Sequence, residues 1–239
     1  MALLKEKDRQ YLIEEFEKRL KDPVKLLVFT QTIACDFCQQ NEDIASEVAG
    51  LSDKITVETY NFVLDKPVVK QYGIDKIPAL ALVGPKDYGI RFYGIPAGYE
   101  FTTLVEDILM VSSGESGLSP EIKELVDLVK TPIHIQVFVT PTCPYCPSAV
   151  SLAHRLAFQS DHIRADMVES IEFPHLAQKY NVMGVPRSVI NETTHVEGAV
   201  PEGHLVAQIL QVAGLIEPQF VEEIMSHAEI TPLAETEKK

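Results

Sequence analysis

The residues of this chain best suited to chemistry are its four cysteines, which form two pairs with two residues inside each pair. The first pair is Cys35 and Cys38, and the second is Cys143 and Cys146. Closely spaced cysteines can form a structural disulfide, bind a metal ion or act as a redox pair. Structural disulfides are uncommon in the reducing cytosol, where such pairs are more often catalytic or metal-binding. The pattern therefore points to redox or metal chemistry.

The two cysteine pairs belong to an internal repeat. A shift of 108 residues carries the first pair onto the second, and the same shift relates Tyr72 to Tyr180 and Pro78 to Pro186. In both halves, 43 residues separate the first cysteine from the proline. Chance would not preserve these distances together, so we infer two copies of one structural unit.

Each half shows the same order of expected elements, in which apolar residues at helical spacing predict helices and β-branched or apolar runs predict strands. In the first half we expect helices at 8–20, from Cys35 onward and near 67–72, and strands at 25–30, 54–62, 78–83 and 89–95. In the second half we expect helices at 118–129, from Cys143 onward and at 202–215, and strands at 133–140, 162–168, 187–191 and 194–200. Ser119 is the expected N-cap of the helix at 118–129, with Pro120 at its first position. The alternation of helices and strands places the chain in the α/β class.

Between the halves lies a stretch of small residues, SSGESG at 112–117, which is typical of a linker. We therefore expect an N-terminal unit at 1–114, which carries the CDFC motif, and a C-terminal unit at 115–239, which carries CPYC. The last residues, from 217 onward, are expected to add at most a short helix.

The bulk composition limits the function classes. The chain has 239 residues, of which 46% are hydrophobic, and a formal net charge of −14. This charge would repel a phosphate backbone or an anionic membrane surface, so we expect neither nucleic acid nor membrane as a partner. The N-terminal residues carry charges throughout and do not form a signal peptide, and no stretch approaches the roughly 20 apolar residues of a membrane span. The expected location is the cytoplasm.

A buried strand, a C-x-x-C motif at the start of a helix and a proline 43 residues later resemble the thioredoxin superfamily, and CPYC resembles the motif of glutaredoxins. Two such units in one chain resemble the protein disulfide oxidoreductases of hyperthermophiles, also named glutaredoxin-like proteins, and the resemblance extends to about residue 216. It implies two tandem thioredoxin-like folds, each with a mixed sheet of about four strands flanked by helices, and it implies thermophily. It also implies disulfide reduction, oxidation or isomerisation in protein substrates, without an organic cofactor. The implied electron donor is a thioredoxin-reductase-like flavoprotein.

The resemblance assigns roles to the cysteines. Cys35 and Cys143 are the expected attacking thiols, and Cys38 and Cys146, one helical turn on, are the expected resolving thiols. A thiol at a helix N-terminus faces free backbone N–H groups and the positive end of the helix dipole, which favour the thiolate. Asp36 places a negative charge beside Cys35, whereas Pro144 brings no charge to the second site. We therefore expect Cys143 to be the more acidic thiol and its disulfide to be the stronger oxidant.

The prolines of the repeat match the cis-proline of the family. Each follows an apolar residue, so the matching dipeptides are Ile77-Pro78 and Val185-Pro186. In the family, the backbone at this position faces the active-site sulfur and holds the substrate chain in strand-like pairing.

The chain departs from the thioredoxin pattern in its proton acceptor. Thioredoxins carry a buried aspartate six residues before the first cysteine, where this chain has Phe29 and Val137. Glu58 and Asp166, which the repeat superposes on the strand after each active-site helix, are either substitute proton acceptors or solvated strand carboxylates. The chain also lacks the Gly-Gly and Asp pair with which glutaredoxins bind glutathione, so protein dithiols are the expected substrates.

Two other interpretations stay open at this point. Four thiolates suffice for a tetrahedral zinc site, although such clamps usually bring their cysteine pairs within about 20 residues of each other. The alternative function is therefore that of a zinc- or cluster-binding interaction protein with a thioredoxin-like fold. A polypeptide-binding module without catalysis is a further alternative, although such modules typically lose one or both cysteines.

Overall fold

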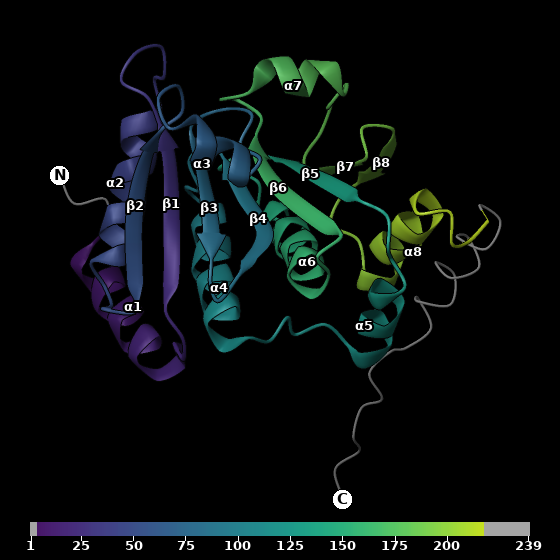
Figure 1. The fold of residues 1–239 in the computed structure, drawn as a ribbon, viewed down its shortest axis with the longest axis horizontal. Coiled ribbons are helices and arrows are strands. Elements are labelled where there is room, and N and C mark those ends of the chain that lie inside the picture. The colour runs from purple at the N-terminus through teal and green to yellow at the C-terminus, as the bar shows by residue number, and fades with distance from the viewer. Residues whose placement is uncertain (1–3, 218–239) are drawn as a thin grey trace, which may run out of the picture.

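The computed structural model describes residues 4–217 and contains eight helices and eight strands within them (Figure 1). The helices are α1 (Glu6–Arg19), α2 (Cys38–Ala49), α3 (Lys66–Gln71), α4 (Glu100–Ser113), α5 (Pro120–Asp127), α6 (Cys146–Gln159), α7 (Pro174–Lys179) and α8 (Glu202–Val212). The strands are β1 (Val24–Thr30), β2 (Ile55–Asn61), β3 (Ala79–Val83), β4 (Asp87–Tyr93), β5 (Ile133–Val139), β6 (Ile163–Glu169), β7 (Arg187–Ile190) and β8 (Thr194–Glu197).

All eight strands form one continuous mixed sheet in the order β2-β1-β3-β4-β6-β5-β7-β8. Each half of the chain contributes four neighbouring strands, and the two sets join where β4 pairs in parallel with β6, from Ile90 opposite Ala165 to Tyr93 opposite Val168. This pairing satisfies backbone groups that would otherwise form two exposed sheet edges. The two sheets expected from the repeat are thus halves of a single larger sheet.

The helices cover the two faces of the sheet unequally. Six helices (α1, α2, α4, α5, α6 and α8) pack on one face, where apolar strand residues such as Leu26, Phe92 and Val137 point toward them. Of the helices in the described residues, the short α3 and α7 lie on the other face, against a smaller core that includes Phe29 and Phe138. In Figure 1 α7 and α3 lie near the top of the view, and α4 and α6 lie behind the strands.

The strands expected from the sequence are confirmed, with ends that differ by a few residues. The N-cap of α5 is also confirmed, because the Ser119 side chain accepts a hydrogen bond from the backbone N–H of Ile122. The helices expected from Cys35 and Cys143 begin instead at Cys38 and Cys146. The sequence patterns do not predict α4 and α7, and α4 is important for the site described below.

The small residues at 112–117 suggest a linker, but this segment is held in place by the residues around it. Helix α4 continues to Ser113 and ends at Gly114, whose φ of 77° is the left-handed conformation that glycine adopts readily. Beyond it, Arg155 of α6 donates hydrogen bonds to the carbonyl oxygens of Ser116 and Gly117. The connection between the units is therefore held by side chains of the second unit. The tail expected to add a short helix lies outside the described residues from 218 onward, and no helix among the described residues is long and apolar enough to cross a membrane.

Candidate redox-active site

Each cysteine pair is closed as a disulfide in the turn that leads from a strand to a helix. The Cα atoms of Cys35 and Cys38 are 5.4 Å apart, and those of Cys143 and Cys146 are 5.5 Å apart. The first cysteine of each pair lies in the turn after β1 or β5, and the second is the first residue of α2 or α6. A residue in the first helical turn has a backbone N–H group without an intrahelical partner, and the second cysteine of each pair is in this position.

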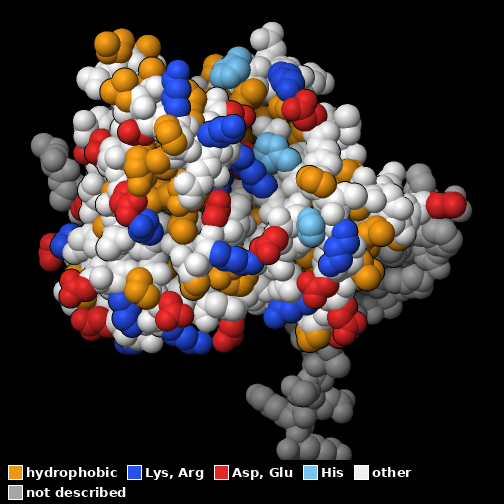
Figure 2. Space-filling model, viewed as in Figure 1, with side chains coloured by type: hydrophobic (Ala, Val, Ile, Leu, Met, Phe, Trp, Pro, Cys, Tyr) orange, Lys and Arg blue, Asp and Glu red, His pale blue; other side chains and the backbone are white. Residues whose placement is uncertain are grey.

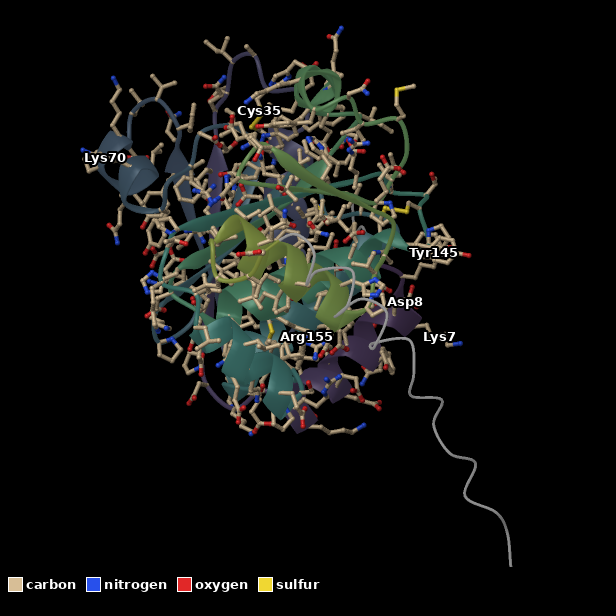
Figure 3. The ribbon with its side chains drawn as sticks, turned by 90° about the vertical axis from the view of Figure 1, so that its right-hand side faces the viewer. Lys7, Asp8, Cys35, Lys70, Tyr145 and Arg155 are labelled. Atoms are coloured by element: carbon tan, nitrogen blue, oxygen red, sulfur yellow. A yellow bond between two sulfur atoms is a disulfide. The ribbon has the colours of Figure 1, made fainter. Side chains whose placement is uncertain are left out.

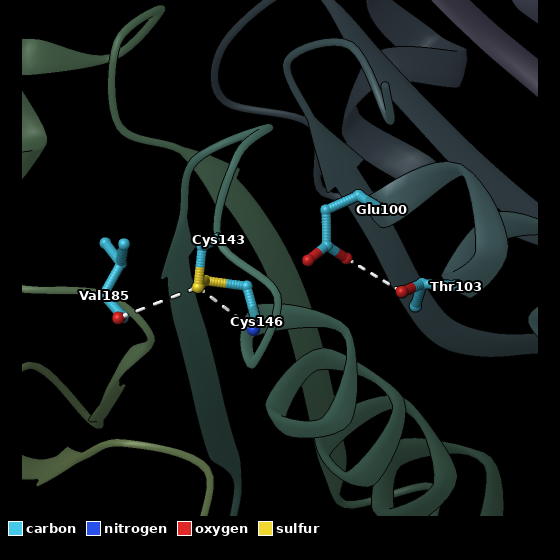
Figure 4. Close-up of a disulfide and its surroundings, with 5 residues drawn as sticks. All are labelled: Glu100, Thr103, Cys143, Cys146 and Val185. Atoms are coloured by element: carbon cyan, nitrogen blue, oxygen red, sulfur yellow. Dashed lines mark hydrogen bonds between the residues drawn. A yellow bond between two sulfur atoms is a disulfide. The ribbon is translucent and has the colours of Figure 1, made fainter. Parts of the chain in front are cut away.

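In the second site, that free N–H group is directed at sulfur. The backbone N–H of Cys146 donates to the Sγ atom of Cys143 over 3.1 Å, and the carbonyl oxygen of Val185 lies 3.7 Å from the same sulfur (Figure 4). A donor aimed at Cys143 Sγ would stabilise a thiolate formed there on reduction. The first cysteine is also the more accessible of the two: Cys143 is 8% exposed and Cys146 is 0% exposed.

The peptide bonds Ile77-Pro78 and Val185-Pro186 are both cis. The carbonyl oxygens of the two prolines make equivalent contacts, with the backbone N–H of Gly94 at 3.0 Å and of Gly198 at 2.8 Å. Each proline immediately precedes a strand, β3 or β7, that runs antiparallel to the strand before the cysteines. At the second site the Val185 contact brings this segment next to the disulfide, and Ile77 has no equivalent contact among the described residues.

A buried carboxylic acid that the sequence patterns do not indicate lies beside the second disulfide. Glu100 is the first residue of α4, is 1% exposed and points toward the Cys143–Cys146 pair (Figure 4). The start of α4 is fixed next to this loop, because the backbone N–H of Tyr99 donates to the carbonyl oxygen of Pro141, two residues before Cys143. Since α4 belongs to the first unit, the carboxylic acid comes from one unit and the cysteines from the other.

The environment of Glu100 favours its protonated form. The side chain of Thr103 donates to Glu100 Oε2 over 2.8 Å, whereas Oε1 is buried without a partner among the described residues. Burial raises the pKa of Glu100 to about 7, even though Thr103 and the nearby His154 both lower it. A carboxyl group with this pKa can give and take a proton near neutral pH.

The two carboxylates of the repeat lie in different surroundings. Glu58 is on the edge strand β2, where it bonds to Lys25 and accepts from the Tyr60 hydroxyl, and its side chain is 40% exposed. The hydrogen bonds to Lys25 and Tyr60 lower the pKa of Glu58.

Asp166 is fully buried between His134 and Arg164, which hold its pKa below the ordinary value despite the opposing effect of burial. Both Glu58 and Asp166 lie on the sheet face of α3 and α7, opposite the active-site helices. Neither contacts a cysteine in the described part of the chain. On this face, Lys, Arg and His side chains gather over the middle of the sheet (Figure 2), and a hollow of about 710 Å³ lies beside Arg164 and His134.

Each disulfide is bordered by exposed apolar side chains. Ile33 and Phe37 are exposed in the turn of the first site, and Tyr145 and Met183 are 69% and 84% exposed at the second. Apolar side chains placed around an accessible disulfide suit contact with a polypeptide.

The two disulfides follow the C-terminal ends of strands β1 and β5, at the same end of the sheet but far from each other. Strands β1 and β5 run in the same direction, and β3, β4 and β6 lie between them. At about 4.8 Å per strand, this places the strands that precede the two sites roughly 19 Å apart. Figure 3 shows Cys35 and Tyr145 at well separated positions. The four sulfurs therefore do not converge on one tetrahedral metal site within a molecule.

Comparison with known proteins gives matches that cover most of the chain. The profile of the family described as "Thioredoxin domain" matches residues 133–211. A protein disulfide oxidoreductase from Aeropyrum pernix is 31% identical, with a TM-score of 0.82 over 88% of this chain and 94% of that one. The N-terminal domain of alkyl hydroperoxide reductase from Enterococcus faecalis is 28% identical, with a TM-score of 0.80 over 86% of this chain and 99% of that domain.

Sequence relatives point in the same direction. A component of the alkyl hydroperoxide reductase of Pseudomonas aeruginosa is 26% identical over 166 residues, which are 70% of this chain and 30% of that protein. The chain spans about a third of the length of the curated relatives it matches. These matches agree with the two disulfides and the eight-stranded sheet on both fold and chemistry. The chain therefore belongs to the protein disulfide oxidoreductases built from two thioredoxin folds, and it is a thiol-disulfide oxidoreductase with two C-x-x-C pairs.

Proposed function

We propose that the chain exchanges disulfides with protein substrates mainly through Cys143 and Cys146, with Glu100 as the proton acceptor of that site. The observation that carries this proposal is the convergence of three groups on the second disulfide. These are the Cys146 N–H group, the Val185 carbonyl next to the cis peptide bond, and the buried carboxyl of Glu100 (Figure 4).

In this proposal Cys143 is the nucleophile. Its thiolate attacks a substrate disulfide, one substrate sulfur leaves as a thiolate, and a mixed disulfide forms on Cys143. The Cys146 N–H group stabilises the attacking thiolate before this step and the Cys143 sulfur as a leaving group in the reverse reaction. The greater accessibility of Cys143 over Cys146 supports this assignment.

Cys146 then resolves the mixed disulfide. Its thiol passes a proton to the carboxylate of Glu100, and the resulting thiolate attacks the Sγ atom of Cys143. The bond between Cys143 and the substrate sulfur breaks, and its electron pair leaves on the substrate. Glu100 suits this role because its pKa of about 7 lies near that of a thiol that must lose a proton at neutral pH.

Protein substrates fit the surface of the site better than small thiols. The backbone at Ile77-Pro78 and Val185-Pro186 is suited to pair with an extended substrate chain, as the family resemblance implies. The exposed side chains of Tyr145 and Met183 supply apolar contacts beside it.

We assign the first site, Cys35 and Cys38, a supporting role. Within the described residues, helix α2 of the first site has no buried acid. It carries the buried amide of Asn41 one turn after Cys38. Asp36 adds a negative charge next to Cys35, which disfavours its thiolate, so Cys143 is the more acidic attacking thiol. In this proposal Glu58 forms a surface ion pair with Lys25, and Asp166 holds Arg164 at the junction between the units. Neither transfers a proton to or from a cysteine. The unit boundary lies at Gly114, where α4 ends.

The proposed partners follow from the relatives. The likeness to the N-terminal domain of alkyl hydroperoxide reductase supports electron exchange with a flavoprotein reductase on one side. It also supports a peroxiredoxin as one acceptor on the other side. A thioredoxin-reductase-like flavoprotein is accordingly the proposed electron donor.

The roles of the two cysteines can be tested by trapping the mixed disulfide. The Cys146→Ser variant lacks the resolving thiol and should hold oxidised insulin chains in a covalent complex, visible on a non-reducing gel and assigned to Cys143 by mass spectrometry. Cys143→Ser is the matched control and should trap little. Equal trapping by Cys143→Ser would contradict the assignment of the nucleophile.

A further inference from the structure

Behind Glu100, the interface between α4 and α6 contains a second buried pair of ionisable groups. Asp107 Oδ2 and His154 Nδ1 are 2.5 Å apart, and these residues are 2% and 0% exposed. Burying such a pair is costly and is often replaceable by apolar side chains without loss of stability. Its presence in an otherwise apolar core therefore calls for a role besides packing.

The pair is aligned with the proton acceptor of the second disulfide. Glu100, Thr103 and Asp107 follow one another at intervals of three and four residues, which places them along one face of α4. His154 projects from α6 against this face and meets the ring of Phe92 edge-on, with 5.0 Å between ring centroids. Its Nε2 atom, like Oε1 of Glu100, is buried without a hydrogen-bond partner among the described residues.

The strands beneath this cluster present mostly apolar side chains to α6, which include Phe92, Val137 and Met167. Among the described residues, the ionisable exception is Glu169 at the end of β6, which is 2% exposed, lies on the same strand face as Met167 and accepts from the backbone N–H of Glu172. The buried charges Arg91 and Asp166 of β4 and β6 belong to the alternate positions, which face α3 and α7. In such surroundings Glu100, Asp107 and His154 act on one another with little screening.

The remaining charged neighbours on the two helices point outward. Glu106 of α4 bonds to Arg19 and is half exposed, and it contributes to raising the pKa of Asp107. Arg155 of α6 bonds to the carbonyl oxygens of Ser116 and Gly117 and to Glu202. The groups that act directly on Glu100 are therefore His154, which lowers its pKa, and Asp107, which raises it.

The Asp107 end of the pair also borders a hollow. Asp107 lines a hollow of about 320 Å³ on the far side of α4, together with Ser113, Ser151 and Arg155. The cluster thus extends from the Cys143–Cys146 disulfide to this hollow beside Asp107.

We propose that Asp107 and His154 are positioning residues that set the proton occupancy of Glu100 and thereby the pH at which Cys146 resolves the mixed disulfide. Asp107 accepts from His154 and holds the imidazole against α4, where Asp107 opposes and His154 favours the carboxylate form of Glu100. That carboxylate takes the proton of Cys146 when its thiolate attacks Cys143 Sγ, and the electron pair leaves on the substrate sulfur. The inference rests on the proposed role of Glu100 as proton acceptor.

The two phases of the reaction with 5,5′-dithiobis(2-nitrobenzoate) separate the relevant steps. In a reduced full-length chain that carries Cys35→Ser and Cys38→Ser, the first thionitrobenzoate released reports attack by Cys143. The second reports resolution by Cys146. His154→Gln should move the pH midpoint of the second phase upward by about one unit. It should leave that of the first phase in place.

Asp107→Asn is the second variant, and it should shift the same midpoint downward, because Asp107 raises the pKa of Glu100. Glu106→Gln, on the neighbouring exposed position, is the matched control and should shift neither phase. If either His154→Gln or Asp107→Asn yields folded protein whose second-phase midpoint equals that of the parent, the inference is overturned.

Glu100→Gln distinguishes this failure from that of the proposed function. Suppose that Glu100→Gln loses the pH-dependent second phase while His154→Gln and Asp107→Asn keep the parent midpoint. Glu100 would then remain the proton acceptor, and only the influence of Asp107 and His154 on it would be rejected. An unchanged profile in Glu100→Gln would reject both. As a measurement that needs no variant, the side-chain ¹⁵N shifts of His154 should change between disulfide and dithiol forms near pH 7, and constant shifts would contradict the proposal.

Discussion

Single residues decide the character of the second disulfide more than its motif does. CPYC places two thiols one helical turn apart, but the proposed proton acceptor of Cys146 comes from the other unit of the chain. Glu100 lies 43 residues before Cys143 and has no counterpart in the motif. Its burial at the start of α4 gives it a pKa of about 7.

The raised pKa of Glu100 predicts a specific dependence of stability on pH. The folded chain binds this proton more tightly than the unfolded chain, so wild-type stability should fall as pH rises from about 4.5 to about 7. Glu100→Gln removes this loss, and its free energy of unfolding relative to wild type should increase by about 3 kcal/mol across that window. Urea unfolding of both proteins at pH 4.5 and pH 8 checks this, and an equal difference at the two pH values would contradict it.

Asp166 and Glu58 offer a second comparison, because the repeat relates them while their surroundings differ. Asp166→Asn should leave the half-buried Arg164 without its buried counter-charge and lower the free energy of unfolding by about 3 kcal/mol at pH 7. Because the pKa of Asp166 is held below its ordinary value, this stabilisation is present above about pH 4 and is lost as pH falls further.

Glu58→Gln is the matched control, and it should cost only a small fraction of that amount because its partner Lys25 is solvated. Urea titrations at pH 7 and pH 3.5 measure both differences. A cost for Asp166→Asn no larger than that for Glu58→Gln would rule out a structural role for the buried network.

At the scale of elements, the strands can be predicted from the sequence and the site helices only in part. Apolar runs such as that of β1 are unambiguous because strands buried on both faces have no polar positions. The sequence places the start of α2 three residues early, because it does not show whether the first cysteine lies in the turn or in the helix. Helix α4 is not evident from the sequence because ten of its residues are buried, which removes the alternation of apolar and polar faces that marks a surface helix.

Glycines at the ends of elements give a prediction at this scale. Gly94 and Gly198 both have positive φ angles and both donate to the carbonyl oxygen of a cis-proline. A Cβ atom at Gly94 would lie 2.6 Å from Glu169 Cβ of the other unit, whereas none of the described residues comes within 4 Å of one at Gly198. Gly94→Ala should therefore lower the melting temperature more than Gly198→Ala, which carries only the backbone cost of about 1–2 kcal/mol for a left-handed conformation. Equal shifts in a thermal scan would contradict the close packing at the junction.

At the scale of the whole molecule, the repeat predicts two equivalent units but not how they combine. The 108-residue shift carries cysteines, tyrosines and prolines onto one another, and the fold repeats accordingly. Neither the pairing of β4 with β6 nor the position of α4 beside the other unit's disulfide can be read from a repeat, because both depend on contacts between the copies. For the same reason the sequence leads to Glu58 and Asp166, which the repeat relates, and not to Glu100, which it does not.

The combination of the units makes the two sites unequal. Arg164 of the second unit bonds to the carbonyl oxygen of Gly73 and to the Tyr93 hydroxyl of the first, which fixes the units across the shared sheet. The first unit thus contributes a disulfide of its own and the proposed proton acceptor of the second. We therefore expect the activity of the chain to depend mainly on Cys143 and Cys146.

The measurement that tests this account most directly is the reduction of insulin driven by dithiothreitol. It compares the wild type with the double variants Cys35→Ser/Cys38→Ser and Cys143→Ser/Cys146→Ser. We predict that the wild type accelerates insulin precipitation well beyond dithiothreitol alone. Most of this activity should be lost in the 143/146 variant and most retained in the 35/38 variant. A wild type no faster than dithiothreitol alone would contradict catalysis of disulfide exchange, and a larger loss in the 35/38 variant would contradict the leading role of the second site.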